Sequence, residues 1–213
     1  MDYLSFFITS FTTIFIIVDP PGNIPMFIAI TEMLDEKDRD RISKKAVLLA
    51  TVLLLLVTVT GGYILYFFKI SMDSLKIAGG ILLFAVSVDI LMGSRRKEAY
   101  VEKSKESVDV DSLAVFPIAL PLYSGPGAIT AAIVLYSTAE TPVMKLMVIL
   151  SILLTYAIVR LTHIYTNQII RVLGKSGSDI VARLMAIFLA AIAVEYTFSG
   201  LEGKIELIMK GIK

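Results

Sequence analysis

The sequence contains no cysteine, no tryptophan and a single histidine. The lack of cysteine excludes disulfide bonds and thiolate metal sites, and one histidine excludes a histidine-rich metal site. Charged residues make up only 18% of the chain, compared with about 25% in an average soluble domain. The basic residues form no continuous stripe, so the sequence predicts no nucleic-acid partner. We also expect no metal and no cofactor.

Apolar residues are abundant instead, at 56% of the chain, and the mean hydropathy is +0.80. Residues 46–68 form a run of 23 residues without a charge, and a helix needs about 20 to cross a bilayer. The apolar segments predict six membrane spans: 3–31 (interrupted), 46–68, 75–93, 113–137 (interrupted), 143–162 and 180–200. The first segment lacks the basic start and the small-residue cleavage site of a signal peptide. We therefore expect a multi-pass protein of the cell membrane, embedded in the lipid bilayer, that retains this segment.

Lysine and arginine residues are unevenly divided between the predicted loops. The loops after the first, third and fifth spans hold thirteen of them, and the opposite side holds six. The side of a membrane protein that is richer in basic residues is usually cytoplasmic. We therefore expect both termini outside the cell, and we interpret residues 94–112, the longest charged connection, as a cytoplasmic linker.

A repeated motif links the first and fourth segments. "VDPPGNIP" (18–25) aligns with "YSGPGAIT" (123–130) at an offset of 105 residues, and both contain the pattern P-G-x-I. "ILLFAVSVD" (81–89) aligns with "IFLAAIAVE" (187–195) at an offset of 106. Self-similarity at a nearly constant offset indicates that the chain is built from two related halves.

Each half has three predicted spans, and because three is odd the second half must enter the membrane from the opposite side. The sequence therefore predicts an all-α membrane protein with six transmembrane helices, arranged as two inverted three-helix repeats, with helices 1 and 4 broken near the membrane midplane. Residues 1–93 are the first repeat, 94–112 the linker and 113–213 the second repeat. Broken helices at matching positions of inverted repeats indicate the binding site of a transporter.

Both motifs are expected to interrupt their helices. Proline removes a backbone donor and clashes with the preceding turn of a helix, and the predicted helix-breaking residues are Pro21, Pro25 and Pro126. Unwound backbone inside a membrane is tolerated only where it faces protein or a water-filled cavity. We therefore expect the two breaks to meet at a cavity.

The chemistry expected at this cavity suits a small zwitterion. A helix that restarts after a break presents free N–H groups and its positive end to a carboxylate. Asp19 is the one acidic residue in either broken segment. Its cost of about 2.5–3.5 kcal/mol at the bilayer centre argues for an ammonium group, a proton or a cation as its partner. The predicted substrate-binding residues are Asp19, Pro20, Gly22, Asn23, Ser124, Gly125, Gly127 and Thr130.

Structural interpretations of the same residues stay open. Kinks at proline and glycine occur for packing alone, and Asp19 could be the N-cap of the second half-helix. Asp89, Glu195 and His163 lie near predicted helix ends and are interpreted as interfacial residues.

An enzyme is not expected, because "LYSG" has Leu122 where a rhomboid-like serine hydrolase requires glycine. The contexts "VDPP" and "SVDI" do not match an intramembrane aspartyl protease either.

Residues 18–25 and 123–130, in a chain with six apolar segments, resemble the MarC family of integral membrane proteins. The resemblance covers essentially the whole chain, and "IAGGILLFAVSVDIL" adds to it. It implies transport of small neutral amino acids such as glycine and alanine, which agrees with the zwitterion site. We therefore expect a secondary transporter that works by alternating access and is coupled to H⁺ or Na⁺. An exporter or channel for another small solute, such as a drug, a metalloid or an ion, stays an alternative, and the oligomeric state is not predicted.

Overall fold

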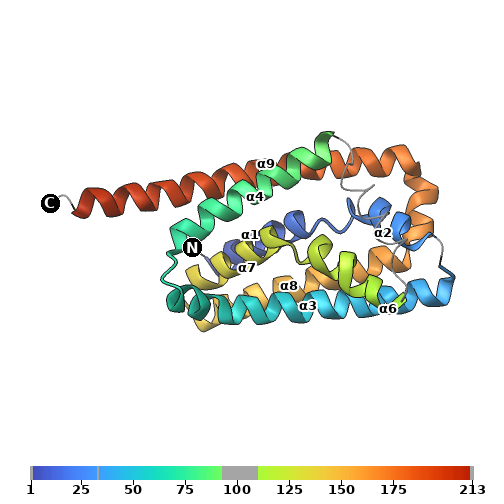
Figure 1. Cartoon of the computed structure of the whole chain (residues 1–213), viewed down its shortest axis with the longest axis horizontal. Helices are drawn as coiled ribbons and strands as arrows, with labels where there is room; N and C mark the ends of the chain where they lie inside the picture. The colour runs from blue at the N-terminus through green and yellow to red at the C-terminus, as the bar shows by residue number, and fades with distance from the viewer. Residues whose placement is uncertain (1, 33, 93–109, 212–213) are drawn as a thin grey trace.

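The computed structural model describes residues 2–32, 34–92 and 110–211, and every regular element in these ranges is a helix. In chain order the elements are α1 (Tyr3–Val18), α2 (Ile24–Thr31), α3 (Glu36–Phe67), α4 (Met72–Met92), α6 (Val110–Leu113), η1 (Ala114–Tyr123), α7 (Pro126–Thr138), α8 (Pro142–Ile164) and α9 (Thr166–Gly211). Figure 1 shows an elongated bundle whose longer helices follow its long axis, with the end of α9 extending beyond the other helices.

Four of these helices are long and apolar enough to cross a membrane: α3, α4, α8 and the Ser176–Lys210 part of α9. The segments Asp111–Tyr123 and Pro126–Thr138 meet at a bend of 58° and form a fifth span if they are taken together. α1 has 16 residues, fewer than the about 20 that a spanning helix needs. The described residues thus confirm an all-helical chain with four or five candidate spans, whereas the sixth span and the inverted arrangement stay predictions.

Two helices are longer than their apolar runs predict. α3 begins at Glu36 because Asp35 caps it, with a side chain that accepts a hydrogen bond from the backbone N–H of Asp38 at 2.8 Å. α9 begins at Thr166 and continues beyond its predicted end, with a bend at Gly174, where φ is 68°. The added turns are polar or mixed in character, so a search for apolar runs does not detect them.

The backbones of α4 and α9 approach each other closely where the two helices lie side by side. A Cβ atom at Gly80 would lie 2.6 Å from the carbonyl oxygen of Ala193, and one at Gly200 would lie 2.6 Å from that of Asp73. Small residues permit such contacts between helices in a membrane, where packing drives association. The small residues of "AGG" (78–80) therefore lie at a helix–helix contact.

Helices from the first half of the chain pack on helices from the second half. α1 packs on α8, α3 packs on η1 and α7, and α4 packs on α9. Large apolar side chains such as Leu48, Leu56 and Leu146 remain exposed on the outside of the bundle. Such an apolar exterior suits contact with lipid tails.

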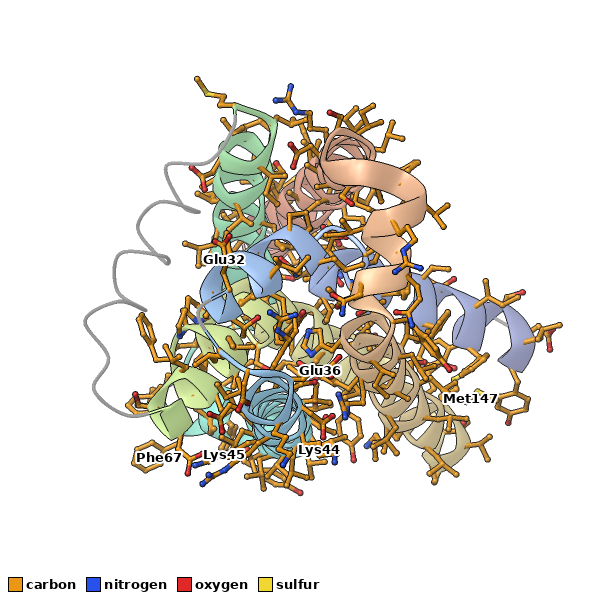
Figure 2. The ribbon with its side chains drawn as sticks, turned by 90° about the vertical axis from the view of Figure 1, so that its right-hand side faces the viewer. Glu32, Glu36, Lys44, Lys45, Phe67 and Met147 are labelled. Carbon is orange, nitrogen blue, oxygen red and sulfur yellow. The ribbon has the colours of Figure 1, made fainter. Side chains whose placement is uncertain are left out.

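Charged segments gather at one end of the bundle. Arg41 pairs with Asp111 at 2.7 Å, Lys45 pairs with the same carboxylate at 3.3 Å, and Arg160 pairs with Asp40. Figure 2 shows this end and labels four of its charged residues: Glu32, Glu36, Lys44 and Lys45. The ion pairs join the start of α3 to α6 and to α8. The structure thus brings segments from the three predicted cytoplasmic loops to one end.

This distribution of charge generates a topology prediction. The variant Ser104→Cys, in the part of the linker outside the described residues, should resist a membrane-impermeant maleimide in intact cells and react after permeabilisation. Glu140→Cys, in the exposed turn between α7 and α8, should react in intact cells. Every signal comes from the introduced residue, since the native chain has no cysteine. Labelling of Ser104→Cys in intact cells would contradict the expected orientation.

Candidate functional site

The first helix break lies between α1 and α2 and keeps its polar groups hydrogen bonded. Asp19 ends α1 with a left-handed φ of 49°, and its N–H donates to the carbonyl of Phe15 at 2.9 Å. Its Oδ1 accepts from the N–H of Gly22 at 3.0 Å, and the Asn23 amide donates to the Val18 carbonyl at 2.8 Å. These bonds supply partners within the protein for the polar groups of the break, as unwound backbone in an apolar bundle requires.

The helix caps at this break differ from the alternative in which Asp19 is the N-cap of the second half-helix. The N-cap of α2 is Asn23, and Asp19 is the C-cap of α1. The hypothesis that Asp19 is the N-cap of the second half-helix is therefore wrong. Pro25 lies in the first turn of α2, where a missing N–H leaves no helical hydrogen bond unmade.

The second break is longer than predicted. Phe116 (φ −132°, ψ 125°) and Leu120 (φ −129°, ψ 130°) leave the helical conformation inside η1. Each precedes a proline, Pro117 or Pro121, and proline disfavours helical angles in the residue before it. The predicted break at Pro126 is therefore the last part of an irregular segment. The two earlier prolines are the sequence signal that indicates its full length.

A backbone carbonyl of α3 and a tyrosine side chain of α8 hold the second break in place. The Ser124 hydroxyl donates to the Ala50 carbonyl at 3.0 Å and lies 2.7 Å from the Tyr156 hydroxyl. Tyr156 also donates to the Tyr123 carbonyl at 3.1 Å. Ser124 is fully buried, and its hydroxyl is engaged within the protein. Its predicted contact with substrate therefore stays a prediction, and no local sequence pattern indicates Tyr156 as its partner.

A cavity of about 50 Å³ lies beside both breaks, among α1, α4, η1, α7 and α9. Five of the predicted binding and helix-breaking residues line it: Asp19, Asn23, Gly125, Pro126 and Gly127. The other six lie outside its lining: Pro20, Pro21, Gly22, Ser124, Pro25 and Thr130. The two breaks thus meet at one cavity, although six of the eleven predicted residues do not line it.

Opposite electrostatic features border this cavity. The Asp19 side chain is 6% exposed, and the N–H of Gly22 is the one donor to its carboxylate among the described residues. Gly127 and Ala128 lie in the first turn of α7, where N–H groups have no acceptor within the helix and the helix dipole is positive. The N-cap residue, Gly125, has no side chain to satisfy them. The Asp19 carboxylate and the backbone N–H donors of α7 therefore border the same cavity.

Several predicted site residues have other surroundings. α2 contributes only its N-cap residue, Asn23, to the lining, whereas α7 contributes its first three residues, Pro126–Ala128. Thr130 packs on α4, because a Cβ atom at Gly79 would lie 2.6 Å from the Thr130 hydroxyl oxygen. Asp89 is half-buried and Glu195 is exposed. Neither of these acidic residues lines the cavity.

The glycines that border the cavity permit close contacts within the protein. A Cβ atom at Gly127 would lie 2.8 Å from Cγ of Leu83 on α4. One at Gly125 would lie 2.7 Å from the carbonyl oxygen of Pro121. Both positions require glycine to hold α7 against its neighbours, in addition to any approach of the backbone to a ligand.

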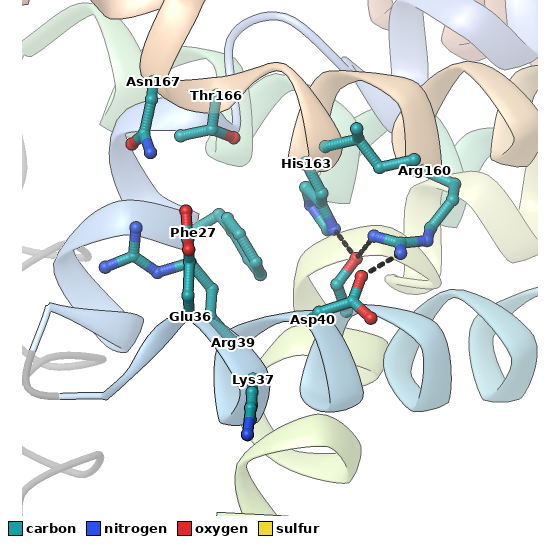
Figure 3. Close-up of a pocket in the computed structure, with 11 residues that line it drawn as sticks. Phe27, Glu36, Lys37, Arg39, Asp40, Arg160, His163, Thr166 and Asn167 are labelled. Carbon is teal, nitrogen blue, oxygen red and sulfur yellow. Dashed lines mark hydrogen bonds and ion pairs between the residues drawn. The ribbon is translucent and has the colours of Figure 1, made fainter.

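His163 has surroundings that its sequence context does not indicate. Its position at the membrane interface stays a prediction, and its side chain is 5% exposed and lies among helices. Its ring stacks on Phe27 with centroids 3.7 Å apart, and its two nitrogens lie 2.8 Å from the Ser43 hydroxyl and 2.6 Å from the Tyr123 hydroxyl. It borders a cavity of about 360 Å³ at the charged end of the bundle, beside Arg160 (Figure 3). The sequence feature that could have indicated a role is that the single histidine lies one helical turn from Arg160.

Apolar helices of spanning length, packed around two broken segments and a small cavity, are the features of a multi-pass integral membrane protein. Residues 4–205 match the model of the MarC family integral membrane proteins, and the chain belongs to this family. It is 63% identical over 203 residues to a UPF0056 membrane protein of Archaeoglobus fulgidus, an alignment that covers 95% of each chain.

More distant relatives cover almost the same length. The chain is 39% identical to a UPF0056 membrane protein of Methanocaldococcus jannaschii, over 94% of this chain and 98% of the relative. It is 32% identical to the UPF0056 membrane protein YhcE of Escherichia coli, over 94% and 92% of the two chains. No solved structure matches the chain. The relatives' names state a membrane location and no substrate.

The first break generates a prediction about stability. In the variant Gly22→Ala the new Cβ atom would lie 2.6 Å from the Asp19 carboxylate oxygen that Gly22 now binds. We expect a lower melting temperature in detergent, because the loop and the carboxylate must separate. Gly62→Ala is the matched control, since its Cβ atom meets nothing closer than the Ser137 hydroxyl at 3.8 Å. Equal melting temperatures for the two variants would contradict the importance of this contact.

Proposed function

We propose that this protein is a secondary transporter of small neutral amino acids, glycine and alanine foremost, in the cell membrane. The observation that carries the proposal is the small cavity at which Asp19 meets the first turn of α7. Substrate reaches this cavity alternately from each side of the membrane. The charged end of the bundle faces the cytoplasm, and both termini lie outside.

The two borders of the cavity complement the two charges of a zwitterion. The Asp19 carboxylate has one donor, the Gly22 N–H, among the described residues. An ionised carboxylate can accept several hydrogen bonds, so Asp19 retains capacity for an ammonium group. The N–H groups of Gly127 and Ala128 suit the carboxylate of the same ligand. Charge-assisted hydrogen bonds at both ends orient the molecule.

The volume of the cavity favours a small ligand. About 50 Å³ is available, and Leu83, Leu122 and Leu189 form part of the wall. Glycine and alanine carry little beyond their charged groups, whereas an aromatic side chain or a bulky drug needs more space. This restriction supports a small amino acid over the alternative of a drug exporter.

Alternating access requires two halves that can exchange roles. In the proposed arrangement α1, the first break and α2 form the first of six spans, and η1 with α7 forms the fourth. The first span of each half packs on the second helix of the other half, and α4 packs on α9. This exchange of equivalent contacts supports a two-fold relation between inverted repeats.

The two halves differ in charge at their breaks. Asp19 corresponds to Ser124 in the repeat alignment, so only one half brings a carboxylate to the centre. We assign this carboxylate to the substrate ammonium group or to the proton or sodium ion that moves with the substrate. A buried acidic residue within a membrane usually has such a role.

Replacement of Asp19 tests the proposal. Asp19→Asn keeps the shape of the side chain and an oxygen for the Gly22 N–H, but it removes the charge. Loss of a charge-assisted hydrogen bond costs about 1.5–3 kcal/mol, so glycine uptake in proteoliposomes should fall roughly 10- to 150-fold. Asp89→Asn is the matched control, because Asp89 lies on α4 outside the cavity lining.

Melting temperatures in detergent must accompany these transport rates. A folded Asp19→Asn protein with normal glycine uptake would show that Asp19 is a structural cap. A loss of uptake in Asp89→Asn equal to that in Asp19→Asn would also contradict the assignment, because the effect would then not depend on the cavity.

A further inference from the structure

Among the described residues, one side-chain hydrogen bond joins a residue that lines the small cavity to a residue that lines the larger cavity. Tyr123 lines the small cavity together with Asp19, and His163 lines the larger cavity at the charged end. The hydroxyl of Tyr123 and Nε2 of His163 are 2.6 Å apart. A single hydrogen bond therefore connects the side chains on the two sides of the wall.

The hydrogen-bonded chain continues beyond His163. Its Nδ1 lies 2.8 Å from the Ser43 hydroxyl, and Arg160 donates to that hydroxyl at 2.8 Å. Arg160 also pairs with Asp40 (Figure 3). Ser43, which lies 120 residues from His163 in the sequence, lines the larger cavity. The chain of hydroxyl, imidazole and hydroxyl thus reaches from one cavity to the other.

An imidazole between two hydroxyl groups is suited to proton transfer. A neutral imidazole has one nitrogen that donates and one that accepts, so it can take a proton on one side and release one on the other. Tyr123 and Ser43 are fully or almost fully buried and His163 is 5% exposed, which excludes bulk water from these bonds. Buried chains of acidic residues and histidines carry protons in membrane transporters.

Structural explanations alone do not account for this arrangement. The stack on Phe27 uses the face of the ring, and an apolar aromatic residue could make it equally well. An apolar wall between the two cavities would need neither the histidine nor the two hydroxyl groups. The polar atoms are therefore the feature that needs an explanation.

We infer that His163 and Tyr123 relay a proton between the larger cavity and Asp19, and that this relay couples the proposed transport to a proton gradient. The inference rests on the proposed function. A proton from the larger cavity passes through Ser43 to Nδ1 of His163, and the proton on Nε2 moves to Tyr123. The Tyr123 hydroxyl releases its own proton into the small cavity, which Asp19 also lines, and the Asp19 carboxylate takes up this proton. One proton is moved, no bond other than O–H and N–H changes, and a turn of the ring restores the first tautomer.

The charges around His163 set the conditions for this step. The titratable and charged groups that border it or the larger cavity are Glu36, Lys37, Arg39 and Asp40 on α3, Arg160 on α8 and Tyr123 on η1. α2 and α9 contribute Phe27, Thr166 and Asn167, which do not titrate. The Arg160 guanidinium, which bonds the same Ser43 hydroxyl as the His163 ring, repels a positive charge on that ring.

His163→Gln tests the relay. Glutamine can bond both neighbouring hydroxyl groups but cannot pass a proton through its amide. Loss of a proton-transferring side chain should lower glycine accumulation driven by an imposed pH gradient in proteoliposomes by roughly 10²-fold. Counterflow of labelled glycine, which needs no net proton movement, should continue at the wild-type rate. Tyr123→Phe, a second variant, should lose gradient-driven accumulation because it lacks the relaying hydroxyl.

Tyr196→Phe is the matched control for the second variant. Tyr196 on α9 has a buried hydroxyl with no hydrogen-bond partner among the described residues and does not line either cavity. Its removal should change neither accumulation nor counterflow.

The outcomes separate the relay from the proposed function. Retention of gradient-driven accumulation in His163→Gln or Tyr123→Phe overturns the relay alone, as does wild-type accumulation driven by sodium and indifferent to pH. Loss of counterflow together with accumulation in both variants also overturns it, because a relay serves only the coupled step. Absence of wild-type counterflow overturns the proposed function, and the relay with it.

Discussion

Unwound backbone within an apolar bundle must find hydrogen-bond partners inside the protein, and most features of this fold follow from that requirement. An unsatisfied backbone group in hydrocarbon costs several kcal/mol. At the first break the Asp19 carboxylate and the Asn23 amide supply the partners locally. At the second break Tyr156 of α8 donates to the Tyr123 carbonyl, and the Ser124 hydroxyl donates to the Ala50 carbonyl of α3.

The same requirement explains why the breaks lie together. Polar groups that cannot face lipid collect where several helices can enclose them, and small residues permit the helices to approach. Gly127 lets α7 lie against Leu83 of α4, and Gly79 receives Thr130. The result is a small space that is bordered by a carboxylate and by the first turn of a helix. A site for a charged ligand is thus built from the groups that the breaks leave available.

Local sequence patterns predict the part of this structure that depends on neighbouring residues. Long apolar runs indicate the spanning helices, and prolines beside glycines indicate both breaks. The extended residues Phe116 and Leu120 follow from the effect of proline on the residue before it. The predicted break at Pro126 did not include them. The start of α3 at the cap residue Asp35 is also a local feature.

Contacts between distant residues explain what the sequence did not reveal. Ser124 is held by Tyr156, and His163 is held by Ser43 and Tyr123, through bonds that join different helices. No periodicity encodes such pairs, so the sequence indicates neither the partners of His163 nor the partner of Ser124. The predicted cavity therefore had the right breaks but only part of the right lining.

Counterflow of labelled glycine in proteoliposomes tests most directly whether the cavity beside Asp19 is a transport site for small amino acids. Vesicles are loaded with unlabelled glycine, alanine or phenylalanine, and the entry of external label is followed in time. A transporter with this cavity predicts transient accumulation of label above equilibrium with internal glycine or alanine, and none with phenylalanine. Simple equilibration at the same rate with all three internal amino acids would indicate a channel, and absence of entry would contradict amino-acid transport.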